Sequence, residues 1–250
     1  MPTTPEPLIL LTNDDGIRSE ALDVTREVLG SVGRVVIVAP DGQRSASGHS
    51  ITLGRCVSVT EKGEDRFALS GTPVDCVYLA CATLLPRIPD LVVSGVNLGL
   101  NVGTDVFYSG TVSAAVEGAI RGSVGIALSS TRFAGPEQWK AAARFTVALF
   151  RRLGDRKGDA YNVNVPEGSI SGYRWTALGS RRYPLEATRC EDPWKRSHYW
   201  LGGDGLGTYE GAVGPDVDAL QQGFISVSPM HLDLTSYSRL PGPDLDWPSI

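Results

Sequence analysis

The stretch from Leu8 to Ile17 constrains the fold most, because four apolar residues in a row are followed, after Thr12 and Asn13, by two adjacent carboxylates and a glycine. An uninterrupted apolar run of this kind is typical of a β-strand that helices cover on both faces, as in a parallel sheet. Asp14 and Asp15 then fall at the C-terminal end of the strand, where open α/β sheets bind their ligands. The sequence therefore predicts an α/β fold with a polar site at the end of its first strand.

The neighbouring carboxylates of Asp14 and Asp15 repel each other, so solvent or a cation must offset the repulsion. Carboxylate oxygens suit Mg²⁺, Mn²⁺ or Ca²⁺, and asparagine and hydroxyl oxygens can complete the shell of such an ion. Asn-Asp-Asp-Gly is equally good turn chemistry, with an aspartate that caps the next helix. These residues alone leave both interpretations open, a metal site and a solvated turn.

Composition narrows the class of protein. The 250-residue chain has a formal net charge of −5 and no dense run of lysine and arginine, which argues against a surface that binds nucleic acid. No apolar stretch approaches the roughly 20 residues that span a bilayer, and residues 1–7 lack the segments of a signal peptide. We expect a cytoplasmic protein. Cys56, Cys76, Cys81 and Cys190 have no CxxC spacing and are expected to be buried free thiols.

Apolar runs alternate with helical patterns along most of the chain. This βαβ rhythm continues to about residue 164 and predicts a Rossmann-like, doubly wound, mostly parallel sheet with right-handed crossovers. An antiparallel excursion is expected around the turn at 61–65, and Thr72 followed by Pro73 is typical of a helix start. The expected strands are 8–12, 34–39, 57–60, 66–69, 91–94 and 125–129, and the expected helices are 20–29, 73–85, 111–121 and 136–153.

The pattern changes after Tyr173. The segment that follows, up to Gly214, is rich in Gly, Trp and Arg and shows short strand-like pieces without a clear helix. Residues 223–228 have the pattern of a strand that returns to the core. We expect a single domain, 1–250, in which about 8–170 and 223–235 form the core and about 173–222 form a β-rich arm or hairpin used in oligomerisation.

Two polar loops follow predicted strands and so fall at the same edge of the sheet as the acid pair. The first, 39–52, carries Ser45 and is rich in hydroxyls, a composition that plain surface loops share. The second, 94–105, carries Asn97 and Asn101. Its glycines do not have the GxGxxG spacing of a dinucleotide fingerprint, which argues against a nicotinamide site.

A third loop, Ser109-Gly110-Thr111, lies immediately before a predicted helix. The free backbone N–H groups and the dipole of a helix start favour an anion, and both hydroxyls are expected to contact that anion and not the cation. A phosphate beside the acid pair would be repelled unless a cation lay between them. Together these features predict metal-assisted hydrolysis of a phosphate ester.

Five ordered blocks over roughly residues 8 to 130 resemble the SurE survival protein family of metal-dependent 5′/3′-nucleotidases. The blocks are Leu11-Thr-Asn-Asp-Asp-Gly-Ile17; Val38-Ala-Pro-Asp41 with Ser45 and Ser50-Ile-Thr52; Ser70-Gly-Thr-Pro73 with Asp75-Cys76; Pro89-Asp-Leu-Val-Val-Ser-Gly-Val-Asn97 with Gly99, Asn101 and Gly103; and Asp105-Val106 with Tyr108-Ser-Gly-Thr-Val112 and Glu117-Gly118.

The resemblance implies hydrolysis of nucleoside 5′- and 3′-monophosphates to nucleoside and phosphate, with one divalent ion per subunit, Mg²⁺ or Mn²⁺. It also implies a Rossmann-like core and an arm that builds a homodimer, which in this family often pairs into a homotetramer. The implied metal ligands are Asp14, Asp15, Ser45 and Asn97, of which the two aspartates are also catalytic, and the implied lining of the phosphate pocket is Asn13, Asn101, Ser109, Gly110 and Thr111.

The chain departs from the family pattern in three places. Residues 17–20 follow the acid pair where the family has a Pro-containing turn, which puts substrate access near Arg18 in doubt. Residues 181–214 give no match, so no contact to a nucleobase carries over. His49 lies where the family varies and is expected to be a loop residue and not a catalytic acid.

The sequence leaves the route of phosphate release open. Either water attacks the phosphorus atom, or Asp14 or Asp15 attacks it and forms an aspartyl-phosphate. Two alternatives from other classes are a non-catalytic module that senses nucleotide or metal, and an oligomeric scaffold with a structural Ca²⁺. An assay of phosphate release separates both from an enzyme.

Overall fold

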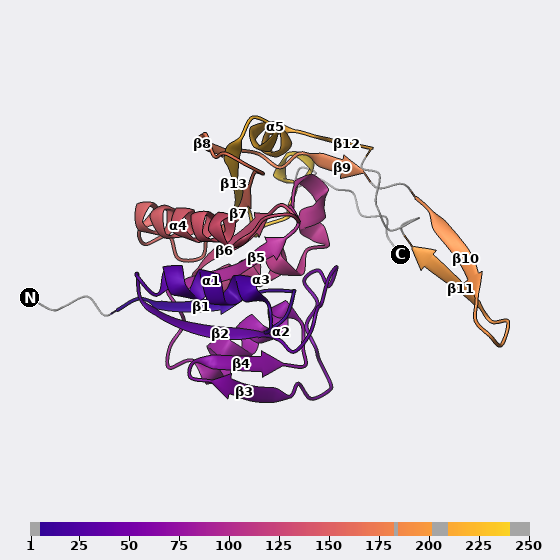
Figure 1. Ribbon diagram of the computed structural model, residues 1–250, viewed down its shortest axis with the longest axis horizontal. Coiled ribbons are helices and arrows are strands. Elements are labelled where there is room, and N and C mark those ends of the chain that lie inside the picture. The colour runs from indigo at the N-terminus through magenta and orange to yellow at the C-terminus, as the bar shows by residue number, and fades with distance from the viewer. Residues whose placement is uncertain (1–5, 183–184, 202–209, 241–250) are drawn as a thin grey trace, which may run out of the picture.

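A nine-stranded sheet forms the centre of the computed structural model, which describes residues 6–182, 185–201 and 210–240 (Figure 1). Its strands are β1 (Leu8–Thr12), β2 (Arg34–Pro40), β3 (Val59–Gly63), β4 (Arg66–Leu69), β5 (Leu91–Leu98), β6 (Val124–Ser130), β7 (Ala160–Val165), β8 (Gly172–Trp175) and β13 (Phe224–Met230). The helices are α1 (Glu20–Leu29), α2 (Pro73–Leu79), α3 (Gly110–Ile120), α4 (Pro136–Leu153) and α5 (Pro215–Gln221), with short turns η1 (Ala80–Leu84), η2 (Gly103–Phe107) and η3 (Tyr237–Arg239). In the described ranges, no helix is both long and apolar enough to cross a membrane.

The sheet is mixed but mostly parallel, in the order β3-β4-β2-β1-β5-β6-β7-β13-β8. Within this order, the neighbouring strands β4, β2, β1, β5, β6 and β7 all run parallel to one another. β3 is antiparallel to β4 at one edge, and β13 is antiparallel to β7 near the other. The expected α/β class with a mostly parallel sheet is confirmed.

Helices cover both faces of the sheet, with α1 beside α4 on one face and α2 beside α3 on the other. Successive side chains of a strand point to opposite faces. Ile9 and Leu11 of β1 accordingly pack in the core under α1 and α4, whereas Leu8 and Leu10 pack in the core under α2. This double coverage is the physical reason for the unbroken apolar run that precedes the acid pair.

The chain changes direction across the sheet at β1. It passes from β1 through α1 to β2 on one side, and later places β5 on the other side of β1. Connections that leave a sheet in opposite directions open a crevice at the carboxyl ends of the two strands, and ligands bind in such crevices. Asp14 and Asp15 follow β1 at this position.

Two expected elements differ in their boundaries. The helix expected over 73–85 is α-helical only to Leu79 and continues as the π-helical turn η1. Its start is as expected, because the Thr72 hydroxyl accepts a hydrogen bond from the Asp75 backbone N–H and the Asp75 carboxylate accepts one from the Thr72 N–H. The strand expected over 57–60 lies instead at Val59–Gly63.

The arm is shorter than the expected 173–222. β8 lies at the edge of the main sheet, parallel to β13, and α5 packs against β13, so both ends of that segment belong to the core. What leaves the core are β9 (Ser180–Arg182), which pairs with β12 (Glu210–Val213), and the hairpin of β10 (Ala187–Glu191) and β11 (Ser197–Leu201). Figure 1 shows this hairpin extending away from the sheet.

The four cysteines are free, as expected. The expectation that all four are buried is wrong for two of them. Cys76 is buried and Cys81 is half-buried, whereas Cys56 and Cys190 are exposed. Cys190 is exposed because it lies on β10, all of whose residues are exposed.

Candidate active site

The turn after β1 presents the acid pair. Asn13 closes this turn, since its side-chain amide donates to the Gly16 carbonyl (3.1 Å) and its side-chain oxygen accepts from the Gly16 N–H (3.0 Å). Gly16 has φ +99°, and a Cβ there would lie 3.0 Å from the backbone carbonyl carbon of Gly42. Both polar groups of the Asn13 side chain therefore have partners inside the turn.

The two carboxyl groups lie in an environment that disfavours their charge. Burial raises the pKa of Asp14, partly offset by hydrogen bonds that include one from the Thr111 hydroxyl (2.7 Å). Burial, and then the charge of Asp14, raise the pKa of Asp15 to about 6. The Oδ2 atom of Asp15 is buried and, among the described residues, has no hydrogen-bond partner. A bound cation would satisfy that oxygen and offset the repulsion.

The loop after β2 is fastened at several points around Ser45. The backbone N–H of Arg44 donates to the Asp14 carbonyl (2.7 Å), and the N–H of Gly48 donates to the Tyr108 carbonyl (3.0 Å). The Ser45 hydroxyl oxygen accepts from the Gln43 side chain (2.9 Å) and stays exposed. The loop therefore holds Ser45 next to the acid pair.

His49 belongs to the same loop. Its Nε2 lies 3.0 Å from the Glu117 carboxylate on α3, and that carboxylate also pairs with Arg121 at 2.6 Å. His49 is not among the residues that line the cavity at the acid pair. Its contact attaches the loop to α3.

Asn97 and Asn101 follow the bend at the end of β5, where the register with β6 shifts between Ser94 and Asn97. The Asn97 amide nitrogen donates to the Gly99 carbonyl (2.7 Å), which leaves its side-chain oxygen for another ligand. Asn101 is almost fully buried, and its amide nitrogen donates to the Ser129 hydroxyl (2.8 Å).

The start of α3 differs in one respect from the expected anion turn. Ser109 is the N-cap residue, and its hydroxyl oxygen accepts from the Val112 N–H (3.1 Å). The Thr111 hydroxyl donates to Asp14, so its proton is not available to a phosphate. Thr111 was expected to contact only the anion, but in the structure it contacts the acid pair.

A cavity of about 600 Å³ joins these segments. Several of the predicted site residues line it, whereas Asn13, Gly110 and Thr111 do not. The described residues contain no group of three His, Cys, Asp or Glu side chains that could hold a metal. The oxygen donors at hand are two carboxylates with neutral hydroxyl and amide oxygens, a set that suits a hard cation. The predicted residues in the lining are Asp14, Asp15, Ser45, Asn97, Asn101 and Ser109.

Comparison with known proteins establishes the family. A family model described as "Survival protein SurE" matches residues 9–184. The chain belongs to the SurE family. This finding confirms the resemblance of the five motif blocks.

Relatives in the SurE family match almost the whole chain. A protein named 5′-nucleotidase SurE from Geobacter sulfurreducens is 43% identical over 238 residues, which cover 93% of this chain and 90% of that protein. Another of that name, from Moorella thermoacetica, is 46% identical over 242 residues, 92% of each. The crystal structure of a SurE protein from Aquifex aeolicus matches with a TM-score of 0.77 at 37% identity, covering 93% of this chain and 96% of that one.

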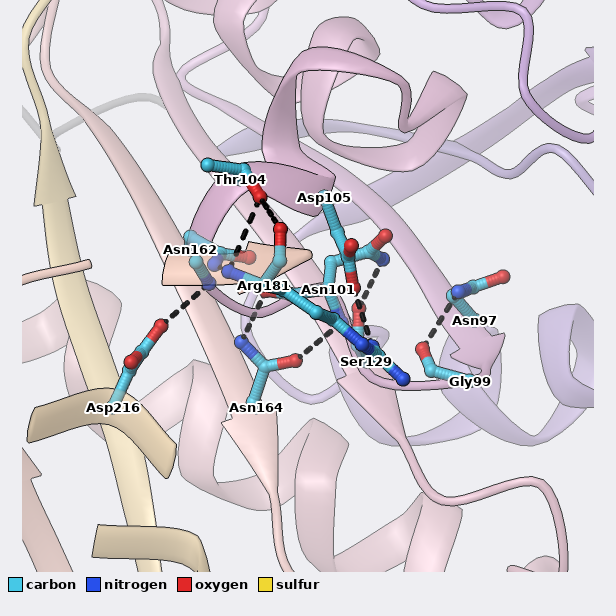
Figure 2. A network of polar contacts seen from close by, with 11 residues as sticks. Asn97, Gly99, Asn101, Thr104, Asp105, Ser129, Asn162, Asn164, Arg181 and Asp216 are labelled. Carbon is cyan, nitrogen blue, oxygen red and sulfur yellow. Dashed lines mark hydrogen bonds and ion pairs between the residues drawn. The ribbon is translucent and has the colours of Figure 1, made fainter. Parts of the chain in front are cut away.

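Two asparagines of β7, which the sequence analysis missed, hold Asn101 in this SurE chain (Figure 2). The side-chain amides of Asn162 and Asn164 donate to the Asn101 carbonyl (2.7 and 2.9 Å), and the Asn164 side-chain oxygen accepts from the Asn101 N–H (2.8 Å). A signal was present in the sequence, because two amides on the same face of a buried strand must find partners.

Three charged residues of the cavity were also missed, Asp105, Arg132 and Arg181. Arg132 comes just after β6 and so lies at the carboxyl edge of the sheet, a position that strand prediction could have indicated. Arg181 comes from the segment that the motif blocks did not reach, although the family model extends to residue 184, and its place in the cavity depends on how the arm folds back.

Proposed function

We propose that this SurE-family protein is a divalent-metal-dependent 5′-nucleotidase that releases phosphate from nucleoside monophosphates and also accepts 3′-monophosphates. The names of its relatives support the nucleotidase activity. The observation that carries the proposal is the buried, unpartnered Oδ2 of Asp15 beside Asp14, in a cavity that also holds the capped start of α3. The cavity of about 600 Å³ falls within the usual range for small-molecule sites.

In this proposal Asp14, Asp15, Ser45 and Asn97 hold one Mg²⁺ or Mn²⁺ ion. When bound, such an ion polarises phosphoryl oxygens and lowers the pKa of a bound water. Thr111 orients the Asp14 carboxylate through its hydroxyl (2.7 Å).

The phosphate side of the site is formed by other groups. The phosphoryl oxygens are held by the backbone N–H of Gly110 at the start of α3 and by the Ser109 hydroxyl. The Ser109 hydroxyl oxygen accepts a hydrogen bond from the Val112 N–H, so its own proton remains for the phosphate. Asn101 lies beside them, with its backbone fixed by β7. Asn13 supports this pocket by closing the turn that presents the acid pair.

Two routes of phosphate release fit these residues, attack by water and attack by an aspartate carboxylate. In the second, the carboxylate displaces the nucleoside oxygen from phosphorus and forms an aspartyl-phosphate, which water then hydrolyses to inorganic phosphate. The two routes can be distinguished with a substrate that is radiolabelled in its phosphate. When the reaction is quenched in acid, only the second route leaves label on the protein.

The direct test of the function is release of inorganic phosphate from a panel of nucleoside 5′- and 3′-monophosphates. We expect release with Mg²⁺ or Mn²⁺, loss of release with excess chelator, and recovery when the ion is added back. Nucleotide binding without phosphate release would indicate a sensing module instead. Metal-dependent stability without nucleotide affinity would indicate a scaffold.

We also propose that the hairpin of the arm builds a homodimer, which can pair into a homotetramer. An isolated two-stranded hairpin is marginally stable in water, and this one exposes Trp194, Tyr199, Trp200 and Leu201. A cluster of exposed apolar side chains of this kind is typical of a surface that binds a protein partner. Trp175, the remaining tryptophan between residues 173 and 214, lies in β8 at the edge of the main sheet and packs edge-on against Tyr161.

Light scattering at micromolar concentration is expected to give at least twice the 26.7 kDa of one chain. Replacing Trp194 and Trp200 together by Ser should lower that mass, because the exposed indoles lose their burial against the partner. Phe133→Ser is the control, since Phe133 is exposed and lies in the loop between β6 and α4, outside the hairpin of β10 and β11. A monomeric mass for the unmodified protein would contradict the dimer.

A further inference from the structure

The base of the arm, Gly179 to Arg182, packs against the η2 turn that precedes the start of α3 (Figure 2). The Thr104 hydroxyl donates to the Arg181 carbonyl (2.5 Å), and the Arg181 N–H donates to the Thr104 hydroxyl oxygen (3.2 Å). The backbones are in close contact, since a Cβ on Gly103 would lie 3.0 Å from the carbonyl carbon of Gly179. Two segments more than seventy residues apart in the sequence therefore form one unit.

A buried carboxylate joins the same two segments. Asp216, at the start of α5, is fully buried and accepts hydrogen bonds from the backbone N–H groups of Gly103 (2.7 Å) and Gly179 (2.9 Å). Hydrogen bonds to a charged acceptor are stronger than those between neutral groups. The position of the arm base relative to η2 is thus determined by the core of the protein.

The side chain of Arg181 extends from this junction into the wall of the cavity, where it forms an ion pair with Asp105. The two side chains are only 10% and 9% exposed. Removing one partner of a buried pair leaves the other charge uncompensated, so loss of either side chain is expected to change the position of the other.

Asp105 in turn shapes the approach to α3. Its backbone carbonyl accepts hydrogen bonds from the N–H groups of Tyr108 (2.9 Å) and Ser109 (3.1 Å). Ser109 is the N-cap of α3 and a proposed phosphate ligand. A continuous series of contacts therefore runs from Arg181 through Asp105 to the proposed phosphate-binding turn.

We propose that Arg181 is a positioning residue for phosphate binding, which makes the base of the arm part of the site. Its guanidinium holds the Asp105 side chain, and Asp105 holds Ser109 in the conformation that binds the phosphoryl group. The inference rests on the function proposed above, but it concerns an ion pair that acts through a second residue. A displacement of such a turn by about 1 Å can cost roughly a hundredfold in rate.

The test compares Arg181→Met with the unmodified full-length protein, both loaded with Mg²⁺ or Mn²⁺. We expect kcat/KM for a nucleoside monophosphate to fall about tenfold or more. This is smaller than the roughly hundredfold loss that displacing a catalytic group by about 1 Å can cause. The inhibition constant of inorganic phosphate should rise in parallel, while the metal affinity measured by calorimetry stays unchanged. Arg156→Met is the control and should leave all three unchanged, because Arg156 is exposed, lies between α4 and β7, and is not part of the cavity lining.

A double-mutant cycle with Asp105→Asn separates positioning from direct contact. If Arg181 acts through Asp105, the double variant loses no more activity than the more damaged single variant. Effects that multiply would mean that Arg181 contacts the substrate itself and would overturn the proposal, as would unchanged phosphate inhibition in Arg181→Met.

If Arg181→Met does not fold, Arg181→Lys replaces it, since lysine keeps the charge but loses the planar guanidinium. A smaller change in the same direction is then expected, and unchanged constants would overturn the proposal. Failure of the proposed function is a separate result, because the unmodified protein would then release no phosphate. The affinity for inorganic phosphate, measured by calorimetry, still tests Arg181 in that case.

Discussion

Replacement of Asp14 or Asp15 by Asn is expected to lower kcat/KM for nucleoside monophosphates by about a thousandfold or more while the fold stays intact. The reason is charge, since each substitution removes one of the two carboxylates proposed to hold the cation. A bound ion contributes several kcal/mol of charge stabilisation in the transition state, and about 1.36 kcal/mol corresponds to tenfold in rate. Steady-state kinetics with calorimetric titration of Mg²⁺ and Mn²⁺ measures both effects.

Thermal unfolding provides a second test, because the expected direction of the change in unfolding temperature is one that a purely structural role for the pair would not predict. Burial and the neighbouring charge disfavour the ionised form of Asp15, whose pKa is raised to about 6. Without metal, Asp15→Asn should therefore unfold at the same temperature as the unmodified protein or at a higher one, because the repulsion is gone. Added metal should stabilise the unmodified protein more than the variant.

Asp41→Asn is the matched control for both measurements. Asp41 lies on the loop that carries Ser45, pairs with Arg44 (2.9 Å) and is about half exposed. Its replacement should change turnover and metal affinity little, because exposed ion pairs contribute little. Near-normal turnover of either Asp14→Asn or Asp15→Asn, with the metal still bound, would remove the acid pair from the reaction.

Gly110→Ala is expected to lower kcat/KM by up to about a hundredfold, the cost of moving a catalytic group by about 1 Å. Gly110 is the first residue of α3, and a Cβ there would lie 2.5 Å from the Ser47 hydroxyl oxygen. It would also lie 3.2 Å from the Pro73 ring and 3.3 Å from the Asp14 Cβ. The added methyl group must displace the Ser47 hydroxyl and crowds Pro73 and Asp14, which changes the packing between the loop that carries Ser45 and the start of the helix.

A second substitution tests this steric account. Ser47→Ala removes the nearest atom, so the double variant Ser47→Ala with Gly110→Ala should recover part of the lost activity. Ser47→Ala alone provides the baseline. Steady-state kinetics of all three variants, together with the inhibition constant of inorganic phosphate, measures this recovery. If the double variant were no better than Gly110→Ala, the clash with Ser47 would not be the cause.

Local signals located most of the core. α4 runs over the expected residues 136–153, because Pro136 fits the first turn of a helix and Gly154, with φ +62°, can end it. The prediction that polar loops after separate strands would meet also agrees with the cavity, which Asp14, Ser45 and Asn97 line together. The roles of these residues stay predictions until the variants are measured.

The end of the chain was harder to predict, because its partners are distant. β8 was placed in the arm, but it pairs with β13 about fifty residues later. Nothing in the short sequence of a strand states which other strand it joins. α5 was missed within the same segment, although Pro215 at its start is a local signal for a helix.

The sequence by itself determined that this chain forms a mostly parallel sheet with an acid pair at the end of its first strand, since apolar runs, caps and turns depend on residues a few positions apart. Only the tertiary structure decided that the Thr111 hydroxyl binds Asp14, 97 positions earlier, and that Arg181 pairs with Asp105, 76 positions earlier. The partner of a buried polar group depends on which distant segments pack around it. Burial then requires that a partner be found there.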